Sequence, residues 1–372
     1  KRKNVVSYIC DLSDEKSVSN LYKQIISRFK LLSGLKLSTS SNAQDGRFTI
    51  SLGDIDIEVR VSVIPGNYGE SFVMRLLDPR HIFSDLDKID FGPKIKELVE
   101  KALARPNGVI LTTGPTGSGK TTTLYAFLNK SYNPEIKIVT IEDPVEYHLE
   151  GITQTQVEEE KGYTFLSGLR SVLRQDPDII MVGEIRDEDT AKIAINAALT
   201  GHIVFSTLHT NNAAGTIPRL IDLKVNPKVI PSALSLSLAQ RLVRKLCPIC
   251  KKEIEANEKD NRIITNILGE MKIDKKEDSM EGFEPAPIYK IYEAVGCDKC
   301  SNGYKGRTGL FEAVPMTREI EELITKNPSE HEIKAVVRKE GIPTMRENGI
   351  IKVLKGETSL DEVSRVIDLY EE

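Results

Sequence analysis

Long apolar segments are missing from this sequence. Among its 372 residues, no hydrophobic run approaches the roughly 18 residues that a helix needs to cross a bilayer, so no membrane span is expected. The first residues, Lys1 to Val5, lack the charged-then-apolar pattern of a signal peptide, and they also lack an initiator methionine. We therefore expect a piece of a longer protein, whose upstream residues can carry further function.

An excess of positive charge is missing as well. Lysine and arginine together number 51 against 55 aspartates and glutamates, which gives a net charge of −4. No block of like charge is long enough to act as an interaction tail. Because nucleic-acid-binding domains usually carry a basic stripe, the composition argues against nucleic acid as a partner. No repeat with a period of 20 to 50 residues is visible either, so a repeat architecture is not expected.

The remaining composition is that of a globular protein with two or three domains, with 40% hydrophobic and 28% charged residues. Residues 1–88 are expected to form a small mixed domain. Helical spacing covers Val18 to Leu35, and alternating patterns predict strands at 47–52, 55–63 and 72–77. The segment Asp78 to Asp90 has the composition of a linker.

Residues 89–372 are expected to form an α/β domain. Short β-rich runs occur at 109–113, 137–141, 178–182 and 203–208, and helical patterns such as Thr190 to Leu199 lie between several of them. Buried strands that alternate with helices indicate a largely parallel sheet. The segment after Pro315 has the pattern of a small helical tail.

The strongest motif begins directly after the first of these runs. Gly114-Pro-Thr-Gly-Ser-Gly-Lys120-Thr121 matches the phosphate-loop pattern G-x-x-x-x-G-K-[ST] in full. Its glycines allow backbone N–H groups to converge on phosphate oxygens, and the following helix turns its positive end toward the anion. Lys120 is expected to reach the β- and γ-phosphates and the Thr121 hydroxyl to bind Mg²⁺. The predicted ATP-binding residues are Gly114, Pro115, Thr116, Gly117, Ser118, Gly119, Lys120, Thr121 and Thr122. A chance glycine-rich turn is the alternative, and the strand–loop–helix context argues against it.

Acidic residues and histidines stand at the ends of three later runs. The segments are Thr140–Glu146 with Glu142, Asp176–Asp187 with Glu184, and Gly201–Thr210 with His202 and His209. Ligands of open α/β sheets bind beyond the carboxyl ends of the strands. A carboxylate there can orient the attacking water or hold Mg²⁺ through water, and a histidine can contact the γ-phosphate. Turn capping by Asp143 and Glu146, and a structural role for His202, are the alternatives.

The cysteines form two pairs and a single residue. Cys247 and Cys250, and Cys297 and Cys300, are C-x-x-C pairs separated by 46 residues, counting 251 through 296. Each pair can supply two thiolates to one tetrahedral Zn²⁺, so we expect one structural zinc within residues 245–312. The alternative is two unrelated buried or redox pairs. Cys10 has no partner in the sequence and is expected to be a small apolar residue.

The four nucleotide-linked segments together resemble the secretion ATPase superfamily, specifically the assembly ATPases of type IV pili and type II secretion. The sequence carries the family's Walker A, Asp box, Walker B ending in Gly183-Glu-Ile-Arg-Asp187, and His box in order. Assembly ATPases of this family carry a four-cysteine subdomain, and retraction ATPases lack it. The segments 292–297 and 303–307 look most like the type IV pilus extension ATPases.

This resemblance implies a RecA-like phosphate-loop ATPase domain preceded by a small α+β, PAS-like domain and carrying a four-cysteine zinc subdomain near the C-terminus. It implies a cytoplasmic homo-hexameric motor, peripheral to the inner membrane through a platform protein, with ATP, Mg²⁺ and Zn²⁺ as cofactors. The usual Ala-Ser-Asp-Ile-His segment and a further N-terminal domain are absent, so the docking region is expected to lie outside this chain.

The resemblance also implies roles for individual residues. Glu142 would be the general base and Glu184 the residue that organises Mg²⁺ and water, with the reverse assignment left open. Arg60 and Arg75 match family arginines that reach the nucleotide phosphates; from the residues alone each is a surface charge. The alternatives in function are the type II secretion ATPase, a RecA-like DNA translocase, and a nucleotide-binding regulator without turnover.

Overall fold

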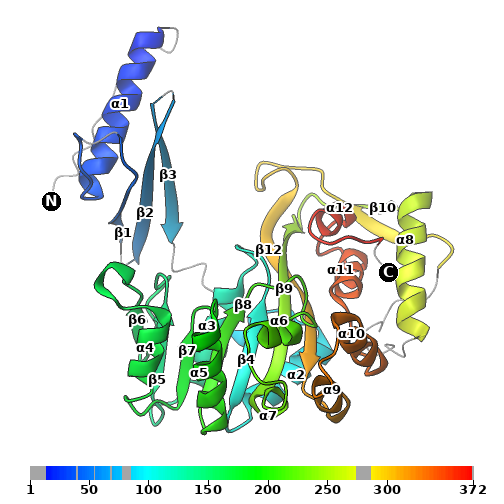
Figure 1. The fold of residues 1–372 in the computed structure, drawn as a ribbon. Coiled ribbons are helices and arrows are strands. Elements are labelled where there is room, and N and C mark those ends of the chain that lie inside the picture. Colours follow the sequence, from blue (N-terminus) through cyan, green and yellow to red (C-terminus); the bar gives the residue numbers. More distant parts are fainter. Residues whose placement is uncertain are drawn as a thin grey trace. The chain divides into compact units, whose positions relative to one another are not determined.

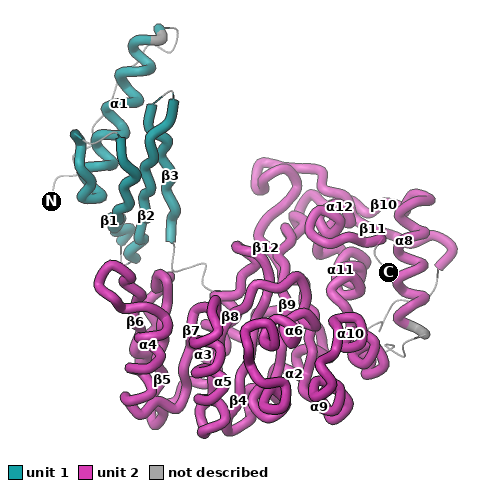
Figure 2. Tube along the Cα trace, viewed as in Figure 1, with its two compact units in different colours: residues 1–82 teal, residues 83–372 magenta. Residues whose placement is uncertain are grey.

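The computed structural model describes residues 14–38, 41–53, 55–67, 69–77, 85–273 and 286–370. The chain divides into two compact units, residues 1–82 and 83–372, which are drawn in different colours in Figure 2. Cys10 and most of the expected linker lie outside the described residues. Each unit is described by itself.

The first unit packs one helix on a three-stranded antiparallel sheet. Its elements are α1 (Glu15–Leu32), β1 (Gln44–Leu52), β2 (Ile55–Gly66) and β3 (Gly69–Leu77), in the sheet order β1-β2-β3. Asp14 begins α1 by accepting hydrogen bonds from the backbone N–H groups of the first turn, and alternate residues of β2, Val59, Val61 and Val63, form the core. The expected helix and strands are present, but the described elements do not confirm a PAS-like fold.

The second unit contains a large sheet, a small sheet and most of the helices. Its large-sheet strands are β4 (Gly108–Thr113), β5 (Ile138–Glu142), β6 (Thr153–Gln156), β7 (Ile179–Val182), β8 (Ile203–Leu208), β9 (Leu234–Leu246) and β12 (Tyr304–Pro315). The small sheet pairs β10 (Lys252–Glu255) with β11 (Lys290–Glu293). The helices are α2 (Pro93–Leu103), α3 (Lys120–Ser131), α4 (Phe165–Val172), α5 (Glu188–Leu199), α6 (Thr216–Asp222), α7 (Ile230–Ala233), α8 (Glu258–Ile273), α9 (Arg318–Ile324), α10 (Glu330–Lys339), α11 (Met345–Leu354) and α12 (Leu360–Ser364), with short 3-10 turns η2 (Leu86–Lys88) and η3 (Glu159–Lys161).

The large sheet is mixed, with the order β12-β9-β4-β8-β7-β5-β6 (Figure 1). All neighbouring strands from β9 to β6 run parallel, and β12 pairs antiparallel with β9. The chain reverses its direction across the sheet after β6, so right-handed crossovers place α3, which precedes the reversal, on one face and α4 and α5, which follow it, on the other. The contacts agree, because α4 packs on α5 and on β5, whereas α3 packs on β4 and β8.

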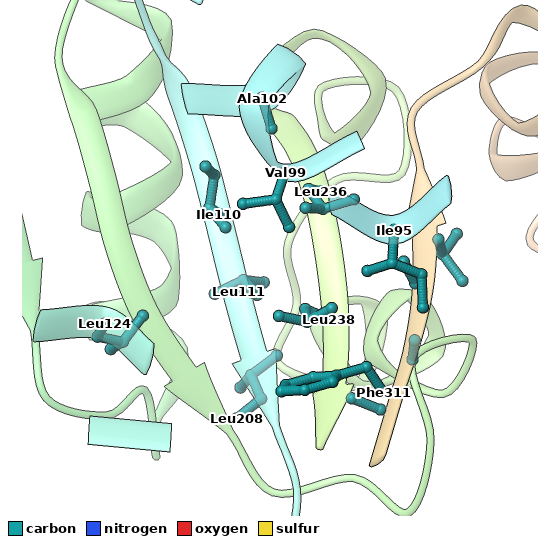
Figure 3. Packing of buried hydrophobic residues seen from close by; sticks show 14 of the residues in the cluster. Ile95, Val99, Ala102, Ile110, Leu111, Leu124, Leu208, Leu236, Leu238 and Phe311 are labelled. Atoms are coloured by element: carbon teal, nitrogen blue, oxygen red, sulfur yellow. The ribbon is translucent and has the colours of Figure 1, made fainter. Parts of the chain in front are cut away.

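The core of the second unit lies between the sheet and these helices. Every residue of β4 is buried, as expected for a central parallel strand covered on both faces. Figure 3 shows Ile95, Val99 and Ala102 of α2 directed onto the sheet. They face side chains of β4, β9 and β12, which include Ile110, Leu236, Leu238 and Phe311. This packing fixes β9 and β12 against β4.

Three strands of the large sheet, β6, β9 and β12, were not expected from the sequence. Strands β9 and β12 pair along most of their length, and the segment between them contains β10, α8 and β11. Helices α9 to α12 follow β12, which agrees with the expected helical tail. Among the described helices, none combines the length and the apolar character that crossing a bilayer requires.

Candidate nucleotide and metal sites

Parallel pairing brings the expected nucleotide residues to one edge of the large sheet. The phosphate loop follows β4, Glu142 ends β5, Glu184 comes two residues after β7, and His209 follows β8. All four strands run in the same direction, so these residues lie at the same carboxyl edge. Strand β9 also runs parallel to β4 and brings Gln240 alongside the start of the loop.

The phosphate loop packs closely against β9 at two of its glycines, Gly114 and Gly119. A Cβ on Gly114 would lie 2.4 Å from the carbonyl oxygen of Gln240, and one on Gly119 would lie 2.7 Å from Gln240 Nε2. Both glycines also have positive φ angles, 145° and 90°. The buried Gln240 side chain accepts a hydrogen bond from Thr123 Oγ1 of α3 at 2.8 Å. Strand β9 therefore sets the curvature of the loop.

The polar groups of the loop fit a phosphate ligand. Lys120 Nζ donates to the carbonyl oxygens of Gly114 and Pro115 at 2.8 and 3.0 Å. Burial lowers the pKa of Lys120, the charge of Glu184 opposes this shift, and Arg241 adds to it. Ser118 Oγ is buried without a hydrogen-bond partner among the described residues, whereas the Thr121 hydroxyl belongs to an exposed side chain at the first turn of α3. An oxyanion at the N-terminus of α3 would meet these donors.

Glu184 is an ionised carboxylate held between two basic side chains. It forms an ion pair with Arg186, and its Oε2 lies 3.2 Å from His209 Nε2. Partial burial acts to raise the pKa of Glu184, but Arg186 and His209 outweigh it and leave this pKa lowered. A charged carboxylate within electrostatic range of Lys120 is a suitable outer ligand for a Mg²⁺ ion held at Thr121.

Glu142 is a buried carboxylate in a different environment. It is 3% exposed and accepts hydrogen bonds from Thr140 Oγ1 at 2.5 Å, from Gln154 Nε2 at 3.0 Å and from the Tyr125 hydroxyl. Burial raises the pKa of Glu142, and these three donors oppose that shift. Tyr125 belongs to α3, so the helix that carries the phosphate loop also holds this carboxylate.

The structure does not bring His202 to this edge, which corrects its assignment to the nucleotide site. His202 precedes β8 and His209 follows it, so the two histidines lie at opposite ends of that strand, about 20 Å apart at ~3.3 Å per residue. Nδ1 of His202 lies 2.9 Å from the carbonyl oxygen of Ala197, at the end of α5. The imidazole lines a separate cavity of about 550 Å³ with Lys130 and Asp178.

Arg60 and Arg75 belong to the first unit and occupy facing positions on β2 and β3. Arg47 of β1 faces Arg60 from the other side, so three arginines lie side by side across the sheet. Arg60 also pairs with Glu58 at 3.2 Å. In the second unit, Arg170 lies on α4, and Arg174 follows its last turn.

The four paired cysteines form one cluster. Cys247 follows β9, Cys250 lies in the next turn, and Cys297 and Cys300 precede β12. Their sulfur atoms all lie within 4.8 Å of one another, with separations of 4.0 Å for Cys247–Cys297, 3.7 Å for Cys250–Cys300 and 3.6 Å for Cys297–Cys300. Zinc–sulfur bonds of about 2.3 Å in a tetrahedron place the sulfurs about 3.8 Å apart, so the residues fit one Zn²⁺.

Comparison with known proteins decides the family. A sequence model of the family described as "Type II/IV secretion system protein" matches residues 8–365. The chain belongs to this family. It is 43% identical over 343 residues to type II secretion system protein E of Aeromonas hydrophila, and 44% identical over 349 residues to the type IV pilus assembly ATPase PilB of Pseudomonas aeruginosa. These alignments cover 92% and 93% of this chain but only 65% and 59% of the two relatives.

Solved structures agree on the α/β ATPase fold of this secretion-system family member. The pilus retraction motor PilT with bound ADP has a TM-score of 0.59 and 26% identity, and covers 87% of this chain, which in turn covers 78% of it. The Legionella pneumophila ATPase DotB has a TM-score of 0.62 at 20% identity, which supports the fold alone, with coverages of 95% and 84%.

Sequence patterns do not indicate four of the side chains at the nucleotide site. Gln240 and Arg241 come from β9, which carried no recognised motif, and Arg241 Nη2 donates to the carbonyl oxygen of Asn211 at 2.8 Å. Tyr125 and Gln154 contact Glu142 but resemble ordinary core and strand residues in sequence. The signal that could have found Gln240 and Arg241 is the alternation of leucine and serine at 234–238, which predicts a strand that ends close to them in the sequence.

We expect the purified protein to contain one zinc ion per chain. Cys250→Ser should lose the metal and loosen residues 247–303, because metal binding and local folding are coupled. Elemental analysis and hydrogen exchange of this segment measure the two effects. Cys10→Ser is the matched control and should keep its zinc. Freshly purified wild-type protein without zinc would contradict the assignment.

Proposed function

We propose that this chain hydrolyses ATP to ADP and phosphate at the edge formed by the phosphate loop, Glu142, Glu184 and His209. The observation that carries the proposal is the convergence of a phosphate cradle, a lysine and two carboxylates in opposite electrostatic environments. Family membership supports it, because the Pseudomonas aeruginosa relative is named an assembly ATPase and one structural neighbour holds ADP. Steady-state phosphate release from ATP and Mg²⁺, with its dependence on both carboxylates, tests the proposal.

The chemistry divides among these residues. The loop N–H groups and Lys120 hold the phosphates, and bound Mg²⁺ would neutralise charge on the β- and γ-phosphates. Glu142 accepts a proton from a water molecule whose oxygen attacks the γ-phosphorus, and the bond to the β–γ bridging oxygen breaks to release ADP. Thr121 and Glu184 are the residues that would hold a bound Mg²⁺, and His209 keeps Glu184 in place.

The different environments of the two carboxylates support Glu142 as the base and Glu184 as the metal-organising residue, rather than the reverse assignment. A general base works best when its pKa is raised toward the operating pH, as burial raises the pKa of Glu142. A metal-organising carboxylate should stay ionised, and the pKa of Glu184 is lowered. Environments that separate two pKa values in this way are typical of paired catalytic acids and bases.

The work done by this hydrolysis is the assembly of type IV pilins by a cytoplasmic homo-hexamer that docks on an inner-membrane platform protein. The four-cysteine cluster supports an assembly ATPase. Assembly of a type II secretion pseudopilus is the second candidate, because the relatives divide between the two systems at nearly equal identity. Neighbouring genes for a pilin and a retraction ATPase would favour the pilus, and genes for a secretion channel would favour secretion.

We expect Arg75→Ala to lower turnover much more than nucleotide affinity, because an arginine on the γ-phosphate matters most as charge develops there. A non-hydrolysable ATP analogue with Mg²⁺ should also shift the protein toward the hexamer. The reason is that a ligand that binds the assembled state more tightly stabilises that state by mass action. Turnover measurements and sedimentation check these outcomes. Arg28→Ala, an exposed arginine on α1, is the control. Normal turnover in Arg75→Ala together with an unchanged sedimentation profile would refute both expectations.

A further inference from the structure

The buried partners of Glu142 define the direction in which this carboxylate can accept a proton. Oε1 accepts two hydrogen bonds, from Thr140 Oγ1 and from Gln154 Nε2. Oε2 accepts one, from the Tyr125 hydroxyl. A carboxylate oxygen has two lone pairs, so Oε1 is complete and Oε2 keeps one acceptor position. Any proton that Glu142 takes up must therefore arrive at Oε2, beside Tyr125.

The Tyr125 hydroxyl is itself fixed in orientation. The backbone N–H groups of Glu146 and Tyr147 hydrogen-bond to it and act to lower its pKa, while burial and the nearby Glu142 charge raise that pKa overall. A phenol oxygen that accepts from backbone groups has its single proton left to donate, and that proton points to Glu142. Gln154 Nε2 also donates to the carbonyl oxygen of Tyr147 at 2.9 Å, so the loop after β5 is joined to the same hydrogen-bond network.

Tyr125 lies in the second turn of α3, the helix that starts at Lys120 and carries the phosphate loop. A hydrogen bond from α3 to the end of β5 therefore links the element that holds the phosphates to the carboxylate at Glu142. Helix α3 is buried from Thr123 to Leu128 and is packed on β4 and β8, so the sheet fixes the position of Tyr125.

We infer that Tyr125 is a positioning residue for the proposed ATP hydrolysis, directing Oε2 of Glu142 toward the attacking water and holding the carboxylate in its ionised form. This inference rests on the proposed function for the role of Glu142 as base. The direction of the effect on the pKa of Glu142 follows from the donor. A hydrogen bond to the charged carboxylate favours ionisation and opposes the effect of burial. The other groups that face Glu142 are Thr140 of β5, Gln154 of β6 and the negative charge of Glu146, and Tyr125→Phe leaves all three in place.

Removal of the Tyr125 hydroxyl should therefore raise the pKa of Glu142 by about one to two units, the range expected for a hydrogen bond to a charged group. The acid limb of the kcat profile should move to higher pH by the same amount, because the base must be deprotonated. The affinity for ATP should stay within about twofold, since the phosphate contacts of Lys120 and the loop are unchanged.

The direct test is a carbon-13 NMR titration of protein labelled at the glutamate carboxyl carbons, with Glu142→Gln used to assign the resonance. The pH dependence of turnover is measured on the same variants. Tyr163→Phe is the matched control, because it removes a phenol that donates to Thr155 on β6 at 2.9 Å without contacting Glu142. It should leave both the titration and the rate profile unchanged.

The outcomes separate this inference from the proposed function. An unchanged Glu142 titration in Tyr125→Phe overturns the inference, whether or not the protein hydrolyses ATP. A raised Glu142 pKa with an unshifted rate profile overturns the directing role of Tyr125 and the assignment of Glu142 as base together. Normal turnover in Glu142→Gln overturns that assignment alone. Gln154→Met, which removes the donor to Oε1, should raise the same pKa and gives a second measurement if Tyr125→Phe folds poorly.

Discussion

Glu142→Gln is expected to bind ATP normally and to lose turnover by a factor of about 10²–10⁴, the usual effect of removing a positioned base. The amide keeps the shape of the side chain, and its oxygen can still accept from Tyr125. What it lacks is the negative charge, and with it the basicity needed to take a proton from water. The measurement is phosphate release at saturating ATP together with nucleotide affinity by calorimetry.

Glu150→Gln provides the comparison for this result. Glu150 is exposed in a turn shortly after the Thr140–Glu146 segment. The substitution makes the same chemical change away from the hydrogen bonds of Glu142. It should turn over at the wild-type rate. Glu184→Gln should also lose most turnover, but with a weaker response to Mg²⁺, because the lost charge is the one that organises the metal. Near-normal rates in both Glu142→Gln and Glu184→Gln would remove the basis for the catalytic assignment.

Lys120→Ala should weaken ATP binding by about 10- to 100-fold, because a charged hydrogen bond to phosphate contributes roughly 1.5–3 kcal/mol. Hydrolysis should become undetectable, since the lysine also neutralises charge on the transferred phosphoryl group. The loss of its bonds to the Gly114 and Pro115 carbonyls exposes two acceptors to water but breaks no buried pair. Calorimetric titration with ATP and Mg²⁺ measures the affinity directly.

Lys130→Ala is the matched control for this variant. Lys130 lies in the last turn of the same helix and lines the cavity at the opposite edge of the sheet. Its removal should leave both affinity and turnover unchanged. Equal losses in the two variants would indicate general damage to α3 and would contradict a specific phosphate contact at Lys120.

Local patterns were enough to predict the central strands and the phosphate loop. Strands β4, β5, β7 and β8 carry mostly apolar, almost wholly buried runs because both of their faces are covered, and the helix after the loop begins at Lys120 within the motif itself. Because ligands bind at the carboxyl ends of parallel strands, the sequence also predicts Glu142, Glu184 and His209 at one edge, and the pairing of β5, β7 and β8 agrees.

The parts that could not be predicted depend on contacts distant in sequence. Gln240 reaches the phosphate loop only because β9 pairs with β4 across more than a hundred residues, and the motif gives no sign of this pairing. Tyr125 resembles any buried aromatic residue of an amphipathic helix. His202 was wrongly placed because it precedes the strand at 203–208, whereas the rule that ligands bind at the carboxyl ends of strands applies only to His209, which follows that strand.

The central claim is that ATP is bound and hydrolysed at the carboxyl edge of this sheet, and steady-state phosphate release tests it most directly. Wild-type protein and Lys120→Ala, purified in the same way and both shown to be folded, are supplied with saturating ATP and Mg²⁺. We predict continuous phosphate release by the wild-type protein and none above background in the variant. Equal release by both proteins, or no release by wild-type protein that has formed its oligomer, would contradict the account.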